Sequence, residues 1–260
     1  MLNLDPKLFS GGKVYQGYGS RRNARIYMED CIRQNVPGFE IPSDDRTLIF
    51  EGWEALCDRF CQPIFFEKSP QILAHWGCLE LILEWIKKTD FDVKIVALVR
   101  NPLSVLYSAQ ELFHTNPRQR QYGWVEIHEN LLRFQSLLSP SQFSLYRYED
   151  IIQNPIDTFD EICQFVGVER FEPMGANVHA SSINKWESDP FFTLQLDESV
   201  KDMAKKLGYE AQALSNPEKP TPPLIQRMSR TMSGKIQRKK AQLRHRLLLP
   251  MMLRFKQIYS

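Results

Sequence analysis

Long apolar runs are missing from this 260-residue chain, and no stretch approaches the roughly 18 apolar residues that a membrane-spanning helix needs. The first twenty residues contain no apolar segment flanked by basic residues, so the sequence predicts no secretory signal. Cysteine is sparse as well. Five scattered thiols exclude a disulfide framework and indicate a reducing compartment: Cys31, Cys57, Cys61, Cys78 and Cys163. No second ligand pair lies near Cys57 and Cys61, so we interpret the cysteines as buried thiols and expect a cytoplasmic protein without a metal.

Acidic residues are absent from the C-terminal segment 224–260, which contains ten basic ones. Because the whole chain has a net charge of +2, the remainder carries −8. Four prolines precede this basic segment and predict a stiff linker. We therefore predict an α/β domain over residues 1–210, a Pro-rich linker over 211–223 and a basic, helical tail over 224–260. The tail has two interpretations: an amphipathic contact with an anionic membrane surface or an acidic partner, or a solvated tail resting on its own acidic domain.

The remaining sequence alternates between strand and helix patterns. Apolar runs at 64–66, 93–99 and 142–146 predict strands, and the run over 93–99 is apolar enough for a strand covered on both faces. Helical periodicity follows each run, over 70–86, 102–113 and 155–167. This order predicts an α/β fold with three layers and a central parallel sheet. Ligands of such folds bind at the carboxyl ends of the strands.

Two polar side chains stand out at one of these strand ends. Arg100 directly follows the 93–99 run, and Ser108 lies eight residues on, about two turns into the next helix. A guanidinium and a hydroxyl at a strand-to-helix junction form a suitable clamp for a phosphate dianion. The alternative is an arginine that pairs with surface carboxylates and a serine that faces solvent.

Four blocks in order resemble the sulfotransferase family. Val93–Ser108 is similar to the family's 3′-phosphate segment, an apolar strand followed by Arg-Asp/Asn-Pro and a Ser eight residues after the Arg. Leu145–Pro155 resembles the block in which the Tyr of a Tyr-Glu-Asp triplet lies near the adenine. Glu67–Pro70 resembles the turn that contains the family's lysine, and Ala180–Trp186 resembles its Ser-rich loop ending in Arg/Lys-Trp. The resemblance covers about residues 65–207.

The resemblance implies a P-loop-type three-layer sandwich and a co-substrate, 3′-phosphoadenosine 5′-phosphosulfate. It implies that Arg100 and Ser108 hold the 3′-phosphate and that Tyr148 lies near the base. Lys185 and Trp186 would close over the nucleotide, Lys185 by its charge and Trp186 by stacking or as an anchor. Lys68 would neutralise charge on the transferring group or on the leaving phosphate, or it is a surface lysine paired with its neighbouring glutamate. The implied partners are this donor and an acceptor hydroxyl or amine on a carbohydrate, small molecule or protein, with no specific nucleic acid.

Two departures from the family pattern concern the chemistry. Relatives begin with a strand and a phosphate loop, roughly Pro-Arg/Lys-Ser-Gly-Thr, that binds the 5′-phosphosulfate. Neither Gly11–Lys13 nor Gly17–Arg21 matches this loop, so we expect an N-terminally truncated fold. Pro70 occupies the position of the catalytic histidine of the cytosolic small-molecule enzymes. Relatives that act on carbohydrates or proteins use a Glu base, so the resemblance implies Glu29 or Glu67 as candidate bases. The alternative function is an inactive, sulfotransferase-like nucleotide-binding protein. A P-loop kinase is disfavoured because no Gly-rich Lys-Ser/Thr loop is present.

Overall fold

A computed structural model describes residues 21–179, 183–220, 222–223 and 226. The Gly-rich segments before Arg21, residues 180–182 of the Ser-rich loop and nearly all of the predicted basic tail lie outside these residues. The chain forms two compact units, which are described separately. The first unit contains the chain up to Leu98, Gly123–Tyr146 and Phe159–Phe171. The second contains Val99–Tyr122, Arg147–Thr158 and the chain from Glu172 onward.

Two packed helices open the first unit, α2 (Arg21–Asn35) and α3 (Asp45–Phe60). Helix α3 begins where Asp44 accepts hydrogen bonds from two backbone N–H groups of its first turn, as a helix N-cap does. Ile32, Leu48 and Leu56 form a buried apolar cluster between the helices. Gly52 permits the close approach, because a Cβ there would come within 2.5 Å of the Ile32 side chain.

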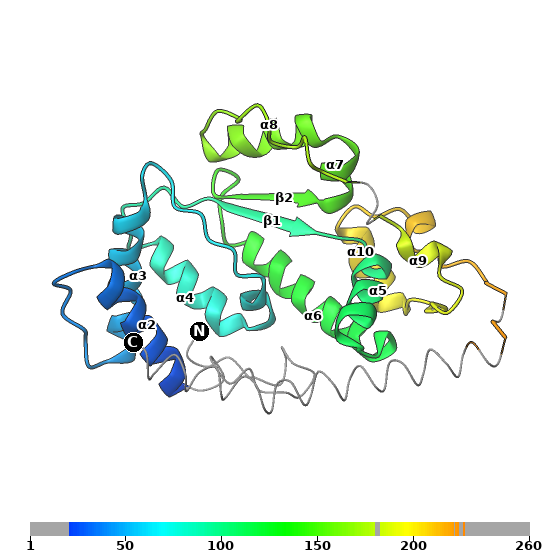
Figure 1. The fold of residues 1–260 in the computed structure, drawn as a ribbon, viewed down its shortest axis with the longest axis horizontal. Coiled ribbons are helices and arrows are strands. Elements are labelled where there is room, and N and C mark those ends of the chain that lie inside the picture. Colours follow the sequence, from blue (N-terminus) through cyan, green and yellow to red (C-terminus); the bar gives the residue numbers. More distant parts are fainter. Residues whose placement is uncertain (1–20, 180–182, 221, 224–225, 227–260) are drawn as a thin grey trace. The chain divides into compact units, whose positions relative to one another are not determined.

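Three further helices of the first unit follow the sequence pattern with one interruption. The predicted helix from Pro70 is divided into a 3₁₀ turn, η1 (Pro70–Ala74), and the helix α4 (Trp76–Ile86), because the backbone of His75 is extended. Helix α6 spans Pro117–Gln135 and enters this unit at Gly123. Figure 1 shows α4 and α6 on one side of the strands and the Phe159–Val166 part of α8 (Pro155–Val166) on the other.

The sheet described by the structure consists of two parallel strands, β1 (Ile95–Val99) and β2 (Phe143–Arg147) (Figure 1). Two predicted strands are thus confirmed. The predicted strand at 64–66 is wrong, because that segment pairs with neither of them and a strand needs a hydrogen-bonded neighbour. The prediction that β1 is covered on both faces is also wrong, since Ala97 and Val99 are buried but Val96 and Leu98 are 36% and 53% exposed.

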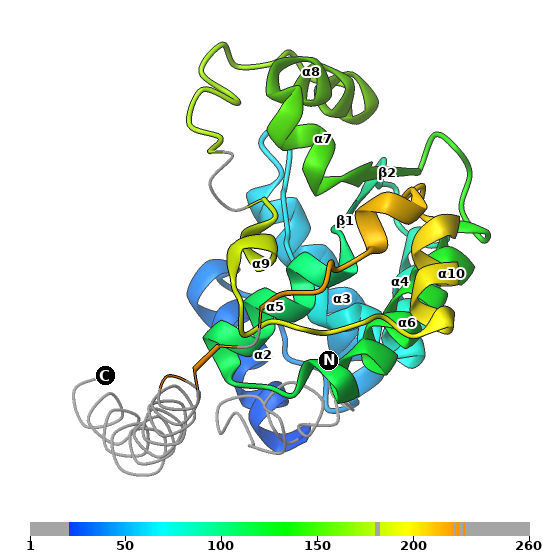
Figure 2. The same cartoon turned by 90° about the vertical axis from the view of Figure 1, so that its right-hand side faces the viewer.

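The second unit is built on α5 (Pro102–Phe113), which begins at the predicted residue with Asn101 as its cap. It also contains α7 (Tyr148–Gln153), α9 (Lys185–Ser188), which packs on α5, and α10 (Glu198–Lys206), which packs on the 3₁₀ turn η3 (Ala211–Leu214) (Figure 2). Its fully buried side chains include Leu103, Leu106, Phe192 and Val200. Among the described helices of both units, none is long and apolar enough to cross a membrane.

Candidate functional site

Arg100 and Tyr148 meet in the second unit, although they are 48 positions apart in the chain. Each residue directly follows a strand, and parallel strands bring their carboxyl ends to one edge of a sheet. The Arg100 guanidinium carbon lies 4.5 Å from the centre of the Tyr148 ring, within the range of a cation–π contact. This contact orients a half-buried cation at the start of α5.

The Glu149 carboxylate links the two polypeptide segments that carry Arg100 and Tyr148. One of its oxygens accepts a hydrogen bond from the Asn101 N–H (3.1 Å), and the other accepts one from the Tyr209 hydroxyl (2.8 Å). The buried Asn101 side chain caps α5 through Leu103 N–H and donates to the carbonyl of Ala213 (2.7 Å). Glu149 and Asn101 thus fasten the residues next to Arg100 and Tyr148 to the segment after α10.

Arg147 makes a second link to that segment. Its guanidinium forms a bidentate ion pair with Asp150, with both distances 2.8 Å, and donates to the carbonyl of Gly208 (2.7 Å). The hydrogen bond to Asp150 raises the pKa of Arg147 above its ordinary value. Burial, together with the charge of Glu149, raises the pKa of Tyr209, so its hydroxyl stays protonated and continues to donate. Arg147 and Tyr209 therefore keep the protons that they donate in these contacts at neutral pH.

At the start of α5, an anion would be bound mainly by side chains and not by backbone N–H groups. The backbone N–H groups of Asn101 and Leu103 already donate to protein oxygens, so these two groups are not available to a phosphate. Ser108 is half-buried on α5, the helix that begins two residues after Arg100. The structure therefore brings Arg100 and Tyr148 into contact and holds Ser108 on the helix that follows Arg100.

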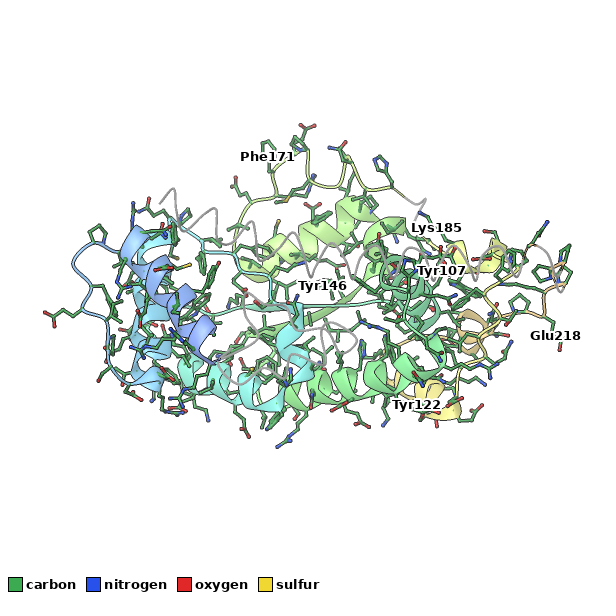
Figure 3. All side chains as sticks on the ribbon, turned by 60° about the horizontal axis from the view of Figure 1, so that its bottom comes forward. Tyr107, Tyr122, Tyr146, Phe171, Lys185 and Glu218 are labelled. Carbon is green, nitrogen blue, oxygen red and sulfur yellow. The ribbon has the colours of Figure 1, made fainter. Side chains whose placement is uncertain are left out.

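Helix α9 carries the next two predicted residues and packs on α5. Lys185 is exposed on α9 (labelled in Figure 3). Trp186 is only 3% exposed, and its ring faces the amino group of Lys219 at 5.6 Å. This burial favours the anchoring role of Trp186 over stacking on a base.

Lys68 belongs to the first unit and lies in an exposed segment between α3 and η1. Within the described chain it forms no ion pair with Glu67, which instead accepts a hydrogen bond from the Ser69 hydroxyl. Glu29, the other candidate base, pairs with Arg25 (2.7 Å) and Arg33 (3.1 Å). The described residues contain no group of three or more His, Cys, Asp or Glu side chains that could hold a metal.

Sequence reasoning missed Tyr209 and the carbonyls of Gly208 and Ala213. Tyr209 lies 60 positions after Glu149, beyond the last block that resembles the family, so no local pattern identified it. The sequence offered only a tyrosine directly after Gly208, the glycine that follows α10, and its burial, which requires a partner for the hydroxyl, is visible in the folded chain alone.

Comparison with known proteins agrees with these observations. A sequence model described as "Sulfotransferase family" matches residues 26–173, more than half of the chain. No curated protein matches significantly. A sulfotransferase domain from the Synechococcus PCC 7002 olefin synthase is structurally similar, with a TM-score of 0.54, 18% identity, and coverage of 74% of this chain and 71% of that one. A sulfotransferase domain from the curacin biosynthetic pathway gives a TM-score of 0.47 and 24% identity over 62% of this chain and 68% of the other. From the family match, this α/β chain belongs to the sulfotransferase family.

Proposed function

We propose that this protein binds 3′-phosphoadenosine 5′-phosphosulfate and transfers its sulfo group to a hydroxyl or amine acceptor. The family match supports a transferase of this type. The observation that carries the proposal is the Arg100–Tyr148 contact at the start of α5, with Ser108 farther along the same helix. A guanidinium held in this way suits a phosphate dianion, because charge-assisted hydrogen bonds to phosphate are strong and directional.

Each site residue has a proposed role in binding the donor. Arg100 and Ser108 bind the 3′-phosphate, and Tyr148 lies near the adenine. Lys185 adds a positive charge over the nucleotide, and Trp186 anchors the helix that carries Lys185. No metal is required for these contacts, since the cations are side chains.

The proposed chemistry is in-line transfer. The acceptor oxygen or nitrogen forms a bond to sulfur while the bond from sulfur to the 5′-phosphate oxygen breaks, and 3′-phosphoadenosine 5′-phosphate leaves. Lys68 stabilises the charge that develops on the transferred group or the leaving phosphate, as cationic side chains do in phosphoryl transfer. Glu29 and Glu67 are the candidate bases for the acceptor proton.

The alternative proposal is an inactive nucleotide-binding protein. It is motivated by the sequence, which contains no match to the family's 5′-phosphosulfate loop. Backbone donors that stabilise the charge of a transition state raise the rate by a factor on the order of 10²–10³. Loss of the loop should therefore lower the turnover of the donor far more than it lowers the affinity for the 3′-phosphate.

The proposal extends to the fold, the cellular compartment and the basic C-terminal segment of the protein. We propose a P-loop-type three-layer sandwich in the cytoplasm. We also propose that the basic segment 224–260 contacts an anionic membrane surface or an acidic partner, because its ten basic residues have no acidic neighbours within the segment.

A turnover assay distinguishes the enzyme from the inactive binder. The full chain is incubated with the sulfo donor and a panel of hydroxyl and amine acceptors, and release of 3′-phosphoadenosine 5′-phosphate is measured. An enzyme shows acceptor-dependent release that falls at least about tenfold in Lys68→Ala, since one catalytic cation is removed. Release no faster than without protein, in a chain that still binds the nucleotide, supports the alternative.

A further inference from the structure

Helix α9, which carries Lys185, cannot hold its own conformation. It has four residues, whereas isolated helices shorter than about 12 residues are marginal in water. Its N-cap, Asn184, has a left-handed backbone with φ of 53° and makes no side-chain capping bond. The position of Lys185 therefore depends on the contacts that neighbouring segments make with α9.

One such segment is Asn216–Lys219, which we call the strap. It follows η3 and runs past α9 and the loop after it, as the orange trace in Figure 2 shows. The buried Asn216 side chain donates to the carbonyls of Phe192 and Leu194, both at 3.0 Å. Gln195 returns a hydrogen bond to the Asn216 carbonyl (2.8 Å). Asn216, the first residue of the strap, thus fixes the strap to the loop that follows α9.

Lys219 fixes the strap at its other end. Its amino group donates to the carbonyls of Asp189 (3.1 Å) and Phe192 (3.0 Å) and to that of Trp186 within α9. It also lies 5.6 Å from the centre of the Trp186 ring. An ammonium group has three donors and no acceptor, so three carbonyls use its hydrogen-bonding capacity completely.

Lys219 is the only basic side chain of the strap. Prolines flank Glu218 and Lys219 and have no N–H to donate. Glu218 is exposed, and Figure 3 shows it at the outside of the molecule. Burial lowers the pKa of Lys219, and the nearby charges of Asp189 and Glu187 oppose that shift.

We propose that Lys219 is a positioning residue for donor binding: it fastens α9 so that Lys185 faces the nucleotide. The inference rests on the proposed donor site, because it assigns to Lys219 an effect exerted through Lys185. Lys219 itself does not contact the nucleotide, since its three donors are engaged by carbonyls.

The test is a double-mutant cycle on the full chain, with calorimetric titration of 3′-phosphoadenosine 5′-phosphate. Lys219→Met keeps most of the stem volume and removes the donors. We expect it to weaken binding about tenfold, the effect of losing one charge-assisted hydrogen bond. In a Lys185→Ala background the same change should have little further effect, because the interaction it supports is already gone. Lys205→Met, which removes an exposed lysine paired with Asp202 at 3.1 Å, is the matched control and should bind normally.

Two results of the titrations overturn the proposal. Unchanged affinity in Lys219→Met shows that α9 does not need the strap. An equal loss in both backgrounds shows that Lys219 acts on general stability and not through Lys185. Tryptic cleavage after Lys185 gives a readout without nucleotide, and it should accelerate in Lys219→Met and not in Lys205→Met. If the unsubstituted chain fails to prefer the 3′-phosphate, the proposed donor site fails, while unchanged cleavage refutes the strap separately.

Discussion

Replacing Tyr209 by phenylalanine tests the network that supports the candidate site. The substitution removes one hydroxyl, which donates to a Glu149 oxygen at 2.8 Å, and leaves a ring that is only 5% exposed in place. The carboxylate oxygen then loses a partner in a half-buried environment. Hydrogen bonds to charged groups contribute about 1.5–3 kcal/mol, so we expect the free energy of unfolding to fall by about 2 kcal/mol.

Urea denaturation measures this change. With a slope of about 2–3 kcal/mol per molar for a chain of this size, the midpoint should fall by about 0.7–1 M while the slope stays constant. Tyr122→Phe is the matched control, because the Tyr122 hydroxyl also donates to a carboxylate, that of Asp197. Tyr122 is 57% exposed, and exposed polar pairs contribute about 0–1 kcal/mol, so its midpoint should move much less.

The cycle with Glu149→Gln separates this bond from other effects of the ring. A glutamine amide can still accept from the Asn101 N–H and can donate to the Tyr209 oxygen, so the contact becomes a neutral one. In that background Tyr209→Phe should lower stability by only about 1 kcal/mol. An unchanged midpoint in Tyr209→Phe, or an equal loss in Tyr122→Phe, would contradict the reasoning.

Two further predictions concern acid stability and the tail. Burial lowers the pKa of His128 to about 4, so the unfolded chain binds a proton that the folded chain rejects as the pH falls below 6.5. The free energy of unfolding should therefore fall by about 2 kcal/mol between pH 6.5 and pH 5. In His128→Gln, the urea midpoint should depend less on pH over this range. Truncation after Thr221 should preserve a cooperative thermal transition, because the removed segment differs in composition and follows prolines. Loss of the transition would show that the tail belongs to the core.

Local patterns in the sequence were sufficient for two strands and for the helical segments that follow residues 70, 102 and 155. The Asn101-Pro102 pair determined the start of α5, since the asparagine side chain caps the helix and proline suits its first turn. The segments of β1 and β2 were recognisable because short runs of β-branched, aromatic and other apolar side chains favour strands. Arg100 and Tyr148 could be expected at one site because they follow parallel strands.

Features that depend on distant neighbours could not be predicted in the same way. The apolar run at 64–66 has strand composition, but composition does not supply a hydrogen-bonded partner. The partners of Glu149 and the carbonyls that bind Lys219 come from segments 27–60 positions away, and only the folded chain shows them. The basic segment 224–260 and the predicted domain boundaries stay predictions.

The central claim is that Arg100 recognises a 3′-phosphate on an adenine nucleotide. Calorimetric titration of the full chain with 3′-phosphoadenosine 5′-phosphate and with AMP tests it directly, beside the same titrations of Arg100→Ala. We expect the 3′-phosphate to strengthen binding at least about tenfold, the effect of one charge-assisted hydrogen bond, and Arg100→Ala to abolish this preference. Equal affinity of the unsubstituted protein for the two nucleotides, or a preference that survives in Arg100→Ala, would contradict the account.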